Sequence, residues 1–130
     1  MMKNCTQRYM FEINPISKPR MTQQDKWKQR KCTSAYWAFK DELKLKFNLF
    51  GLKELPSVIS SVSFYIPMPD SWSDKKKREM NGRNHTQKPD LDNLLKGLMD
   101  AVCKHDEHIS EITHGLKKCW ATKGEIIIEI

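Results

Sequence analysis

A run of apolar residues at helical spacing, directly behind a proline, constrains the fold of this chain more than any other feature. Five apolar positions recur at i, i+3, i+4, i+7 and i+11: Leu91, Leu94, Leu95, Leu98 and Val102. This spacing predicts an amphipathic helix with one buried face. Pro89 disfavours helical geometry at the residue before it, so we expect the helix to begin just after Pro89. Other segments must supply the core against which the apolar face packs.

The rest of the chain predicts a small α/β (α+β) domain. The chain has 130 residues, which fits one domain, residues 1–130, with a modest core. A second stripe at helical spacing predicts a helix over residues 33–47, and its members are Tyr36, Phe39, Lys40, Leu43 and Phe47. Lys40 is the only polar member of this stripe. A short helix is expected near residues 75–80.

Four segments are typical of β-strands: 9–13, 58–66, 109–121 and 125–130. In the second segment, alternate residues fall on one face and indicate a half-buried strand: Val58, Ser60, Val62, Phe64 and Ile66. The last two strands are joined near Lys123 and Gly124, and we expect them to form a hairpin. The order of the elements therefore predicts one mixed sheet of about four strands with two main helices.

The balance of charges favours an anionic partner. The chain carries 23 Lys and Arg residues against 16 Asp and Glu residues, which gives a net charge of +7. Nucleic acid is the commonest partner for such an excess, although a solvated basic face gives the same composition. The candidates for contacts with a phosphate backbone are Lys18, Arg20, Lys75, Lys76, Lys77, Arg78, Arg83 and Lys88. For the basic segment from Lys18 to Lys31, a phosphate-binding loop and a flexible surface arm both remain open.

The cysteines and the hydropathy pattern indicate a cytoplasmic protein. Cys5, Cys32, Cys103 and Cys119 are scattered and form no C-x-x-C pair, so we expect free thiols in a reducing compartment. The N-terminus has no apolar segment of the kind found in secretory signals. No apolar run approaches the roughly 20 residues needed to cross a bilayer.

Two carboxylates stand at the expected start of the helix behind Pro89. Asp90 lies at or next to the N-cap, where its side chain can accept backbone N–H bonds, and Asp92 follows two residues later. Asp92, Lys96 and Asp100 fall at i, i+4 and i+8 and form one polar stripe. Acids this close together in a basic chain are costly unless a cation lies between them. The pattern therefore suggests a Mg²⁺ site, because Mg²⁺ prefers carboxylate oxygens and retains several waters.

Such a site would suit the hydrolysis of a phosphodiester. A bound ion lowers the pKa of a water nucleophile and offsets the charge that develops on phosphorus. Asp106 and Glu107 follow the helix, and a reversal of the chain there would bring Asp106 back toward Asp90 and Asp92. Lys96 would hold the carboxylate geometry or stabilise the transition state.

The same residues also have ordinary structural interpretations. Acids suit the first turn of any helix, and a Lys96–Asp92 pair is worth a few tenths of a kcal/mol. His105 and His108 stand three residues apart and suggest zinc, but no further ligand completes a familiar spacing. His85 is interpreted as a phosphate contact or a turn residue rather than a general base.

The block from Lys88 to Val102, followed by Asp106-Glu107-His108-Ile109, resembles the RusA family of Holliday junction resolvases. The family occurs in bacteria and in their phages and prophages. Its pattern is K-P-D-x-D-N-L-x-K-x-x-x-D-A-[LV], followed by an acidic pair before a strand. The resemblance implies a homodimeric endonuclease, dependent on Mg²⁺ with Mn²⁺ as a substitute, that nicks two opposed strands of a four-way DNA junction.

The resemblance also assigns roles residue by residue. It makes Asp90, Asp92 and Asp106 the catalytic acids that bind the metal ion, with Asp106 as the third acid, and it makes Lys96 the catalytic lysine. Family members usually carry an Asp-Asp pair where this chain has His105-Asp106, so Glu107 stays open as an alternative to Asp106. Two other functions also stay open: a non-catalytic DNA-binding accessory protein, and a nuclease for other branched DNA.

Overall fold

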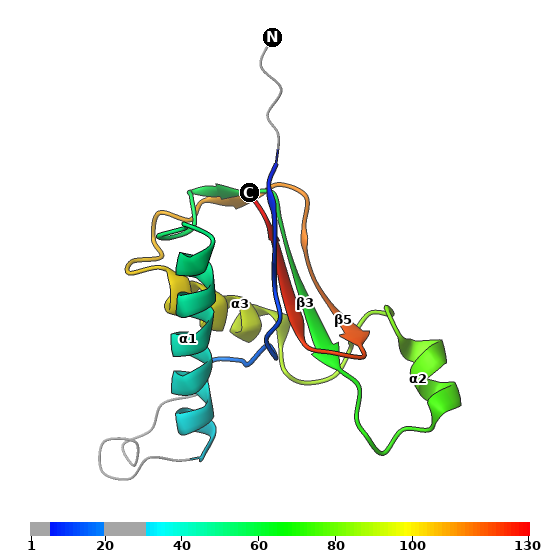
Figure 1. Ribbon diagram of the computed structural model, residues 1–130. Coiled ribbons are helices and arrows are strands. Elements are labelled where there is room, and N and C mark those ends of the chain that lie inside the picture. Colours follow the sequence, from blue (N-terminus) through cyan, green and yellow to red (C-terminus); the bar gives the residue numbers. More distant parts are fainter. Residues whose placement is uncertain (1–5, 20–30) are drawn as a thin grey trace.

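Within residues 6–19 and 31–130, which the computed structural model describes, the chain forms three helices and six strands (Figure 1). In chain order they are β1 (Arg8–Phe11), α1 (Lys31–Leu49), β2 (Val58–Ile59), β3 (Ser61–Pro67), α2 (Asp74–Met80), α3 (Leu91–Val102), β4 (Glu111–Ile112), β5 (Leu116–Ala121) and β6 (Glu125–Glu129). The three predicted helices are confirmed, and α3 begins two residues after Pro89. None of these helices is long and apolar enough to cross a membrane.

The main sheet has four strands in the order β1-β6-β3-β5. The strand β6 pairs antiparallel with both β1 and β3, whereas β5 pairs parallel with β3. A separate parallel pair joins β2 to β4. The predicted α+β class and mixed four-stranded sheet are therefore confirmed.

The predicted C-terminal hairpin is wrong, because β3 lies between β5 and β6. The strand β3 is rich in buried apolar residues and uses both of its edges for pairing. The short connection after Ala121 instead crosses the end of β3, where the Met68 N–H donates to the Ala121 carbonyl at 2.9 Å. A short turn between two strands thus does not by itself make them neighbours.

The predicted strand over residues 58–66 is divided at Ser60 into β2 and β3. A bend at this residue reverses the face on which the side chains lie. Val58, which the alternation placed with Val62, is 47% exposed, whereas Ile59 is fully buried. The Ser60 N–H donates to the Glu129 carbonyl at 2.8 Å, so the bend is held against the end of β6.

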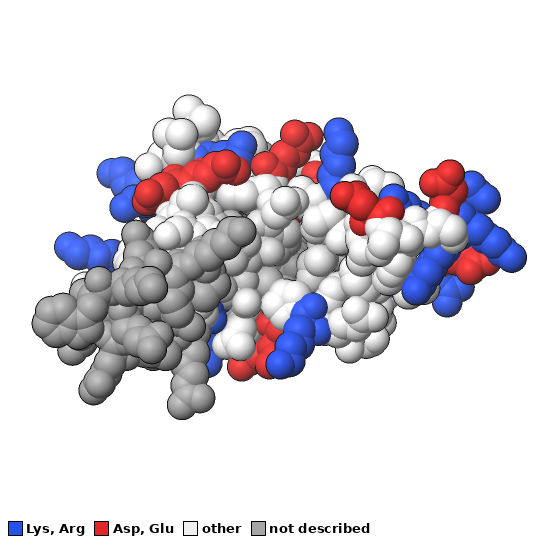
Figure 2. All heavy atoms as spheres, turned by 90° about the horizontal axis from the view of Figure 1, so that it is seen from below, with Lys and Arg blue, Asp and Glu red and all other residues white. Residues whose placement is uncertain are grey.

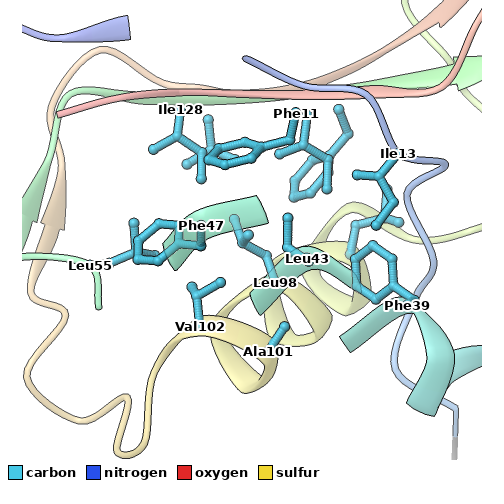
Figure 3. Packing of buried hydrophobic residues seen from close by; sticks show 14 of the residues in the cluster. Phe11, Ile13, Phe39, Leu43, Phe47, Leu55, Leu98, Ala101, Val102 and Ile128 are labelled. Atoms are coloured by element: carbon cyan, nitrogen blue, oxygen red, sulfur yellow. The ribbon is translucent and has the colours of Figure 1, made fainter. Parts of the chain in front are cut away.

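The core lies between the sheet and two helices, α1 and α3, which cover the same face of the sheet (Figures 1 and 3). The stripe predicted for α1 is buried, with Phe39, Leu43 and Phe47 at most 4% exposed. Leu98 of α3 and Ile128 of β6 are fully buried in the same cluster. Burial of these side chains fixes α3, and with it the acids at its N-terminus, relative to the sheet.

A glycine in α3 allows the segment after β1 to pack closely on the helix. A Cβ atom on Gly97 would lie 2.8 Å from the Ile16 carbonyl oxygen, which belongs to the backbone. Two residues further on, the Lys18 N–H donates to the Asn93 carbonyl at 3.2 Å. Gly97 therefore places Lys18 beside α3.

Candidate active site

Asp90 occupies the N-cap position of α3, but its carboxylate does not cap the helix. Its backbone is extended, with φ −69° and ψ 143°, and its side chain accepts no capping hydrogen bond. The expectation that Asp90 accepts backbone N–H bonds is therefore wrong. The residue is exposed, so this carboxylate faces solvent at the positive end of the helix, where the helix dipole favours a negative charge.

Asp92 and Lys96 lie in the first turns of the same helix and form a long ion pair. The Lys96 Nζ is 4.0 Å from the Asp92 Oδ2. The two side chains are 60% and 72% exposed, so the ion pair contributes little to stability. Both groups remain accessible to a metal ion or a phosphate.

Asp106 lies beyond the opposite end of α3. The 12 residues of the helix span about 18 Å at 1.5 Å per residue, and the loop that follows leaves from its C-terminal end (Figure 1). A turn closed by the Ile109 N–H to the Asp106 carbonyl leads to Ser110, whose N–H bonds to the Ser57 carbonyl near β2. The chain is thus directed away from the start of α3.

Consequently the structure keeps Asp90, Asp92 and Lys96 in the N-terminal half of the helix region, with Lys96 near Asp92, and it places Asp106 and Glu107 beyond the other end of α3. Across residues 6–19 and 31–130, no three His, Cys, Asp or Glu side chains lie close enough to hold a metal ion. The pair of Asp90 and Asp92 nevertheless fits Mg²⁺, which is commonly bound through one or two carboxylates while water and substrate phosphates complete its shell. The uncommitted Asp90 carboxylate supports this fit.

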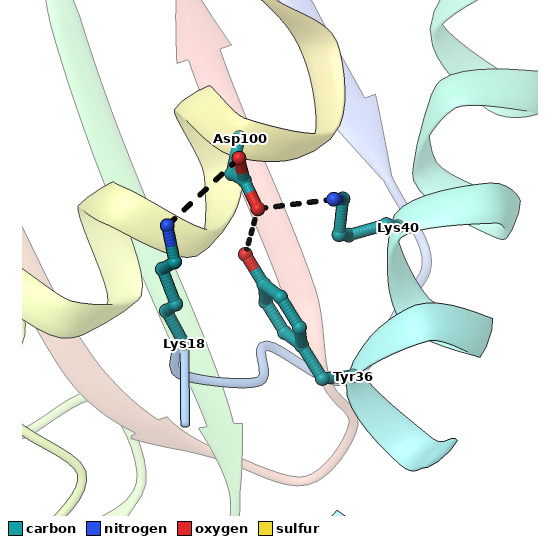
Figure 4. Close-up of polar contacts among 4 residues, drawn as sticks. All are labelled: Lys18, Tyr36, Lys40 and Asp100. Carbon is teal, nitrogen blue, oxygen red and sulfur yellow. Dashed lines mark hydrogen bonds and ion pairs between the residues drawn. The ribbon is translucent and has the colours of Figure 1, made fainter. Parts of the chain in front are cut away.

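Asp100, expected to continue the polar stripe, turns instead toward α1 (Figure 4). The Tyr36 hydroxyl donates to its Oδ2 at 2.6 Å, and the Lys40 Nζ lies 3.0 Å from the same oxygen. The Lys18 Nζ is 4.0 Å from Oδ1. Partial burial opposes ionisation of Asp100, but the bonds from Tyr36 and Lys40 outweigh it and lower the pKa of this carboxyl. Burial and the nearby carboxylate in turn raise the pKa of Tyr36.

His85 is buried rather than available to a phosphate, so its interpretation as a phosphate contact is wrong. The residue is 3% exposed, and its ring centroid lies 4.0 Å from that of Trp120. Its Nδ1 has no hydrogen-bond partner among the described residues. Burial and the nearby charge of Lys118 lower the pKa of His85, which favours the neutral ring.

His108 holds the loop after α3 through both of its ring nitrogens. Its Nε2 lies 2.7 Å from the Leu55 carbonyl oxygen, and its Nδ1 lies 2.8 Å from the His105 carbonyl oxygen. Carbonyl oxygens only accept, so this geometry suits an imidazolium that donates twice. The bond to Leu55 is the main reason that the pKa of His108 is raised. A ring engaged in this way does not present a nitrogen to zinc.

The basic residues expected to contact DNA fall into two groups. Lys75, Lys76, Lys77 and Arg78 belong to α2, which stands apart from the other helices and buries none of its residues (Figure 1). Figure 2 shows Lys and Arg side chains gathered at that end of the molecule. Arg83, Lys88 and Lys18 are exposed or partly exposed nearer the body of the protein. Arg20 lies outside the described residues.

The α2 arm is attached to the sheet by a tilted contact between two tryptophan rings. The Trp72 and Trp120 ring centroids lie 4.7 Å apart, and the Lys76 Nζ lies 4.2 Å above the Trp72 ring. Ser73 caps α2 by accepting a hydrogen bond from the Lys76 N–H at 3.2 Å. This contact sets the position from which α2 presents its charges.

Two lysines not recognised in the sequence make specific contacts. Lys40 binds Asp100, and its polar character within an apolar helical stripe was the available signal. Lys118 of β5 binds the carbonyls of Gln87 and Pro89, just before Asp90. Its position between Leu116 and Trp120 at alternate residues of the strand was the signal for an inward-facing charge.

The two cysteines whose side chains the structure describes are free thiols, as expected from the sequence. Cys103 and Cys119 are buried and not bonded to another cysteine. Burial raises the pKa of the Cys103 thiol, so this side chain behaves as a small apolar group. Cys5 lies outside the described residues, and the side chain of Cys32 is not described.

A family model described as endodeoxyribonuclease RusA matches residues 12–130 of the chain. No curated protein matches it.

Proposed function

Because the chain belongs to the RusA endodeoxyribonuclease family, which acts on Holliday junctions, we propose that it cleaves DNA with a Mg²⁺ ion bound by Asp90 and Asp92. The observation that carries this proposal is the carboxylate of Asp90, which occupies a helix N-cap yet makes no capping bond. At that position the helix itself gains only the weak attraction between the carboxylate and the helix dipole. Binding of a metal ion would give the carboxylate a specific contact.

In this proposal the chain's own residues position the reactants. The carboxylates of Asp90 and Asp92 hold the ion at the N-terminus of α3, where exposed side chains leave room for DNA. When bound, Mg²⁺, or Mn²⁺ in its place, lowers the pKa of a water nucleophile and offsets charge on the phosphate. Lys96, loosely paired with Asp92, donates to a phosphate oxygen or to the leaving oxygen.

Asp106 remains the proposed third acid, with Glu107 as the alternative. In the structure both lie past the far end of α3. A site that contains three acids therefore requires the loop after α3 to move or a second copy of the chain to supply the residue.

We further propose that the protein acts as a homodimer on a four-way junction. A junction has two equivalent scissile strands, and a two-fold dimer places one site on each so that the nicks are paired and symmetric. The lysines of α2, together with Lys18, Arg20, Arg83 and Lys88, contact the phosphate backbone. Such contacts recognise the shape of the DNA rather than its sequence.

A comparison of substrates tests this function. Labelled four-way junction, fork, flap and linear duplex are incubated with the protein, with and without Mg²⁺. Paired nicks in the junction that require the metal are expected. Binding without scission across a series of divalent metals would instead indicate a DNA-binding accessory protein, and preferred cutting of flaps or forks would indicate a different branched substrate.

A further inference from the structure

We propose that Lys118 is a positioning residue for the catalytic turn, defined as residues 87–90. Its ammonium fixes the backbone from which Asp90 presents its carboxylate to the metal ion. The inference rests on the proposed function of Asp90. It adds a residue from another element, the strand β5, which lies outside the sequence block that carries the acids.

The first support is the pair of hydrogen bonds made by the Lys118 Nζ. It donates to the carbonyl oxygens of Gln87 and Pro89, and the second bond measures 2.6 Å. The Pro89 carbonyl belongs to the peptide group directly before the Asp90 Cα. The peptide group after that Cα is held as well, because the Asp90 carbonyl accepts the Leu94 N–H at 3.1 Å. Both sides of the Asp90 Cα are therefore fixed.

The second support is that the backbone of Lys118 holds the segment that leads into the turn. Its carbonyl accepts the His85 N–H at 3.0 Å, and the Trp120 N–H donates to the Arg83 carbonyl at 2.9 Å. The buried ring of His85 packs on Trp120. The edge of β5 thus sets the path of the chain from Arg83 onward, and the Lys118 side chain completes it up to Asp90.

The third support is that Lys118 carries its charge at a half-buried position of β5. It lies on the strand between Leu116, which packs against the core, and the buried Trp120. Among the residues that the structure describes, Lys118 forms no ion pair with a carboxylate. Its charge strengthens the two bonds to carbonyl oxygens, since charge-assisted hydrogen bonds are about twice as strong as neutral ones. A neutral side chain would leave both carbonyls without this donor.

The neighbouring Lys117 provides a matched control. It precedes Lys118 in the same strand, its side chain points to the opposite face, and it is exposed. Lys117→Met and Lys118→Met remove the same charge from adjacent positions. Any difference between them reports on the contacts of Lys118 and not on net charge.

The test compares Lys118→Met, Lys118→Arg and Lys117→Met with the wild-type protein. Three quantities are measured: the rate of junction cleavage at saturating Mg²⁺, the affinity for junction DNA without metal, and Mn²⁺ binding to the free protein by electron paramagnetic resonance. Loss of a residue that orients a metal ligand typically costs about 10- to 100-fold in activity or metal affinity. For Lys118→Met we expect a loss of this size in both the cleavage rate and the Mn²⁺ affinity. Lys118→Arg should recover part of each, and Lys117→Met should keep the wild-type values. The affinity for junction DNA should be similar in the two methionine variants.

The outcomes separate this inference from the proposed function. If the wild-type protein cleaves and Lys118→Met matches Lys117→Met in rate and Mn²⁺ affinity, Lys118 is not a positioning residue. If the wild-type protein does not cleave any DNA, the proposed function fails, and the Mn²⁺ titration still decides the role of Lys118. Should Lys118→Met fail to fold, as judged by its thermal unfolding, Lys118→Gln and Lys117→Gln replace the methionine pair. The glutamine amide is a shorter and uncharged donor, so a loss relative to Lys117→Gln is still expected, and equal values in the two variants would overturn the inference.

Discussion

The aspartate at the N-cap of α3 and the aspartate near its C-terminal end lie in different surroundings and therefore make different interactions. Asp90 is exposed at the helix N-terminus and makes no capping bond. Asp100, further along the helix, is partly buried and receives a hydrogen bond from Tyr36 and an ion pair from Lys40. The first carboxylate is free to bind a ligand, whereas the second joins α3 to α1.

At this scale, Tyr36→Phe is expected to destabilise the protein by about 1–2 kcal/mol, because it removes a hydrogen bond to a charged and partly buried group. Urea unfolding followed by circular dichroism measures the change. The control is Tyr65→Phe, which deletes a hydroxyl from the face of β3 that points away from the core. It should reduce the free energy of unfolding by less. Equal losses in the two variants would show that Asp100 gains nothing specific from Tyr36.

At the scale of elements, close packing of α3 depends on the absence of a side chain at Gly97. Gly97→Ala improves helix propensity by about 1 kcal/mol. Its new Cβ, however, would lie 2.8 Å from the Ile16 carbonyl oxygen, which cannot rotate away. We expect net destabilisation of about 1–2 kcal/mol, measured by thermal unfolding. Asn48→Ala, at an exposed position of α1, should be neutral or stabilising, and the same result for Gly97→Ala would contradict the close contact.

The loop that carries Asp106 should be sensitive to pH through His108. The folded state raises the pKa of His108, mainly through its bond to the Leu55 carbonyl. The stabilisation is therefore complete below about pH 6.5, the value for an unfolded histidine, and is lost as the pH rises through the folded pKa. As the pH rises above about 6.5, the Tm of the wild-type protein should fall relative to the Tm of His108→Gln. A difference in Tm between the two proteins that stays constant with pH would rule the effect out.

The elements also show which parts of the fold follow from local sequence. Periodicity located α1 and α3 and their buried faces, because 3.6-residue spacing is a local property. The short connection after β5 predicted the wrong partner for β6, because the partner of a strand depends on the whole sheet and β3 pairs with both β5 and β6. The role of Lys118 was missed for the same reason, since its partners lie 29 and 31 residues away in the sequence. Asp90 and Asp92 could be proposed from the sequence because the motif and the predicted helix start coincide.

At the scale of the whole molecule, the basic α2 arm should contribute much of the affinity for DNA. Each phosphate neutralised by a lysine adds about 0.7–0.9 to the slope of log K against log salt concentration. Replacement of Lys75, Lys76 and Lys77 by glutamine should reduce the slope by about 2–3, measured by fluorescence anisotropy with junction DNA. A control triple replacement at the exposed Lys44, Lys53 and Lys123 removes the same charge. Equal slopes in the two triple variants would show that α2 has no special role.

The central claim is that Asp90 binds a catalytic metal ion, and the most direct measurement is junction cleavage by Asp90→Asn beside Asp74→Asn. Asp74 is an exposed aspartate at the first residue of another helix, α2, and so matches Asp90 in charge and in its closeness to a helix N-terminus. Asp90→Asn should bind the junction as the wild-type protein does and lose Mg²⁺-dependent cleavage by at least about 100-fold, while Asp74→Asn should cleave normally. Normal cleavage by Asp90→Asn would contradict the assignment.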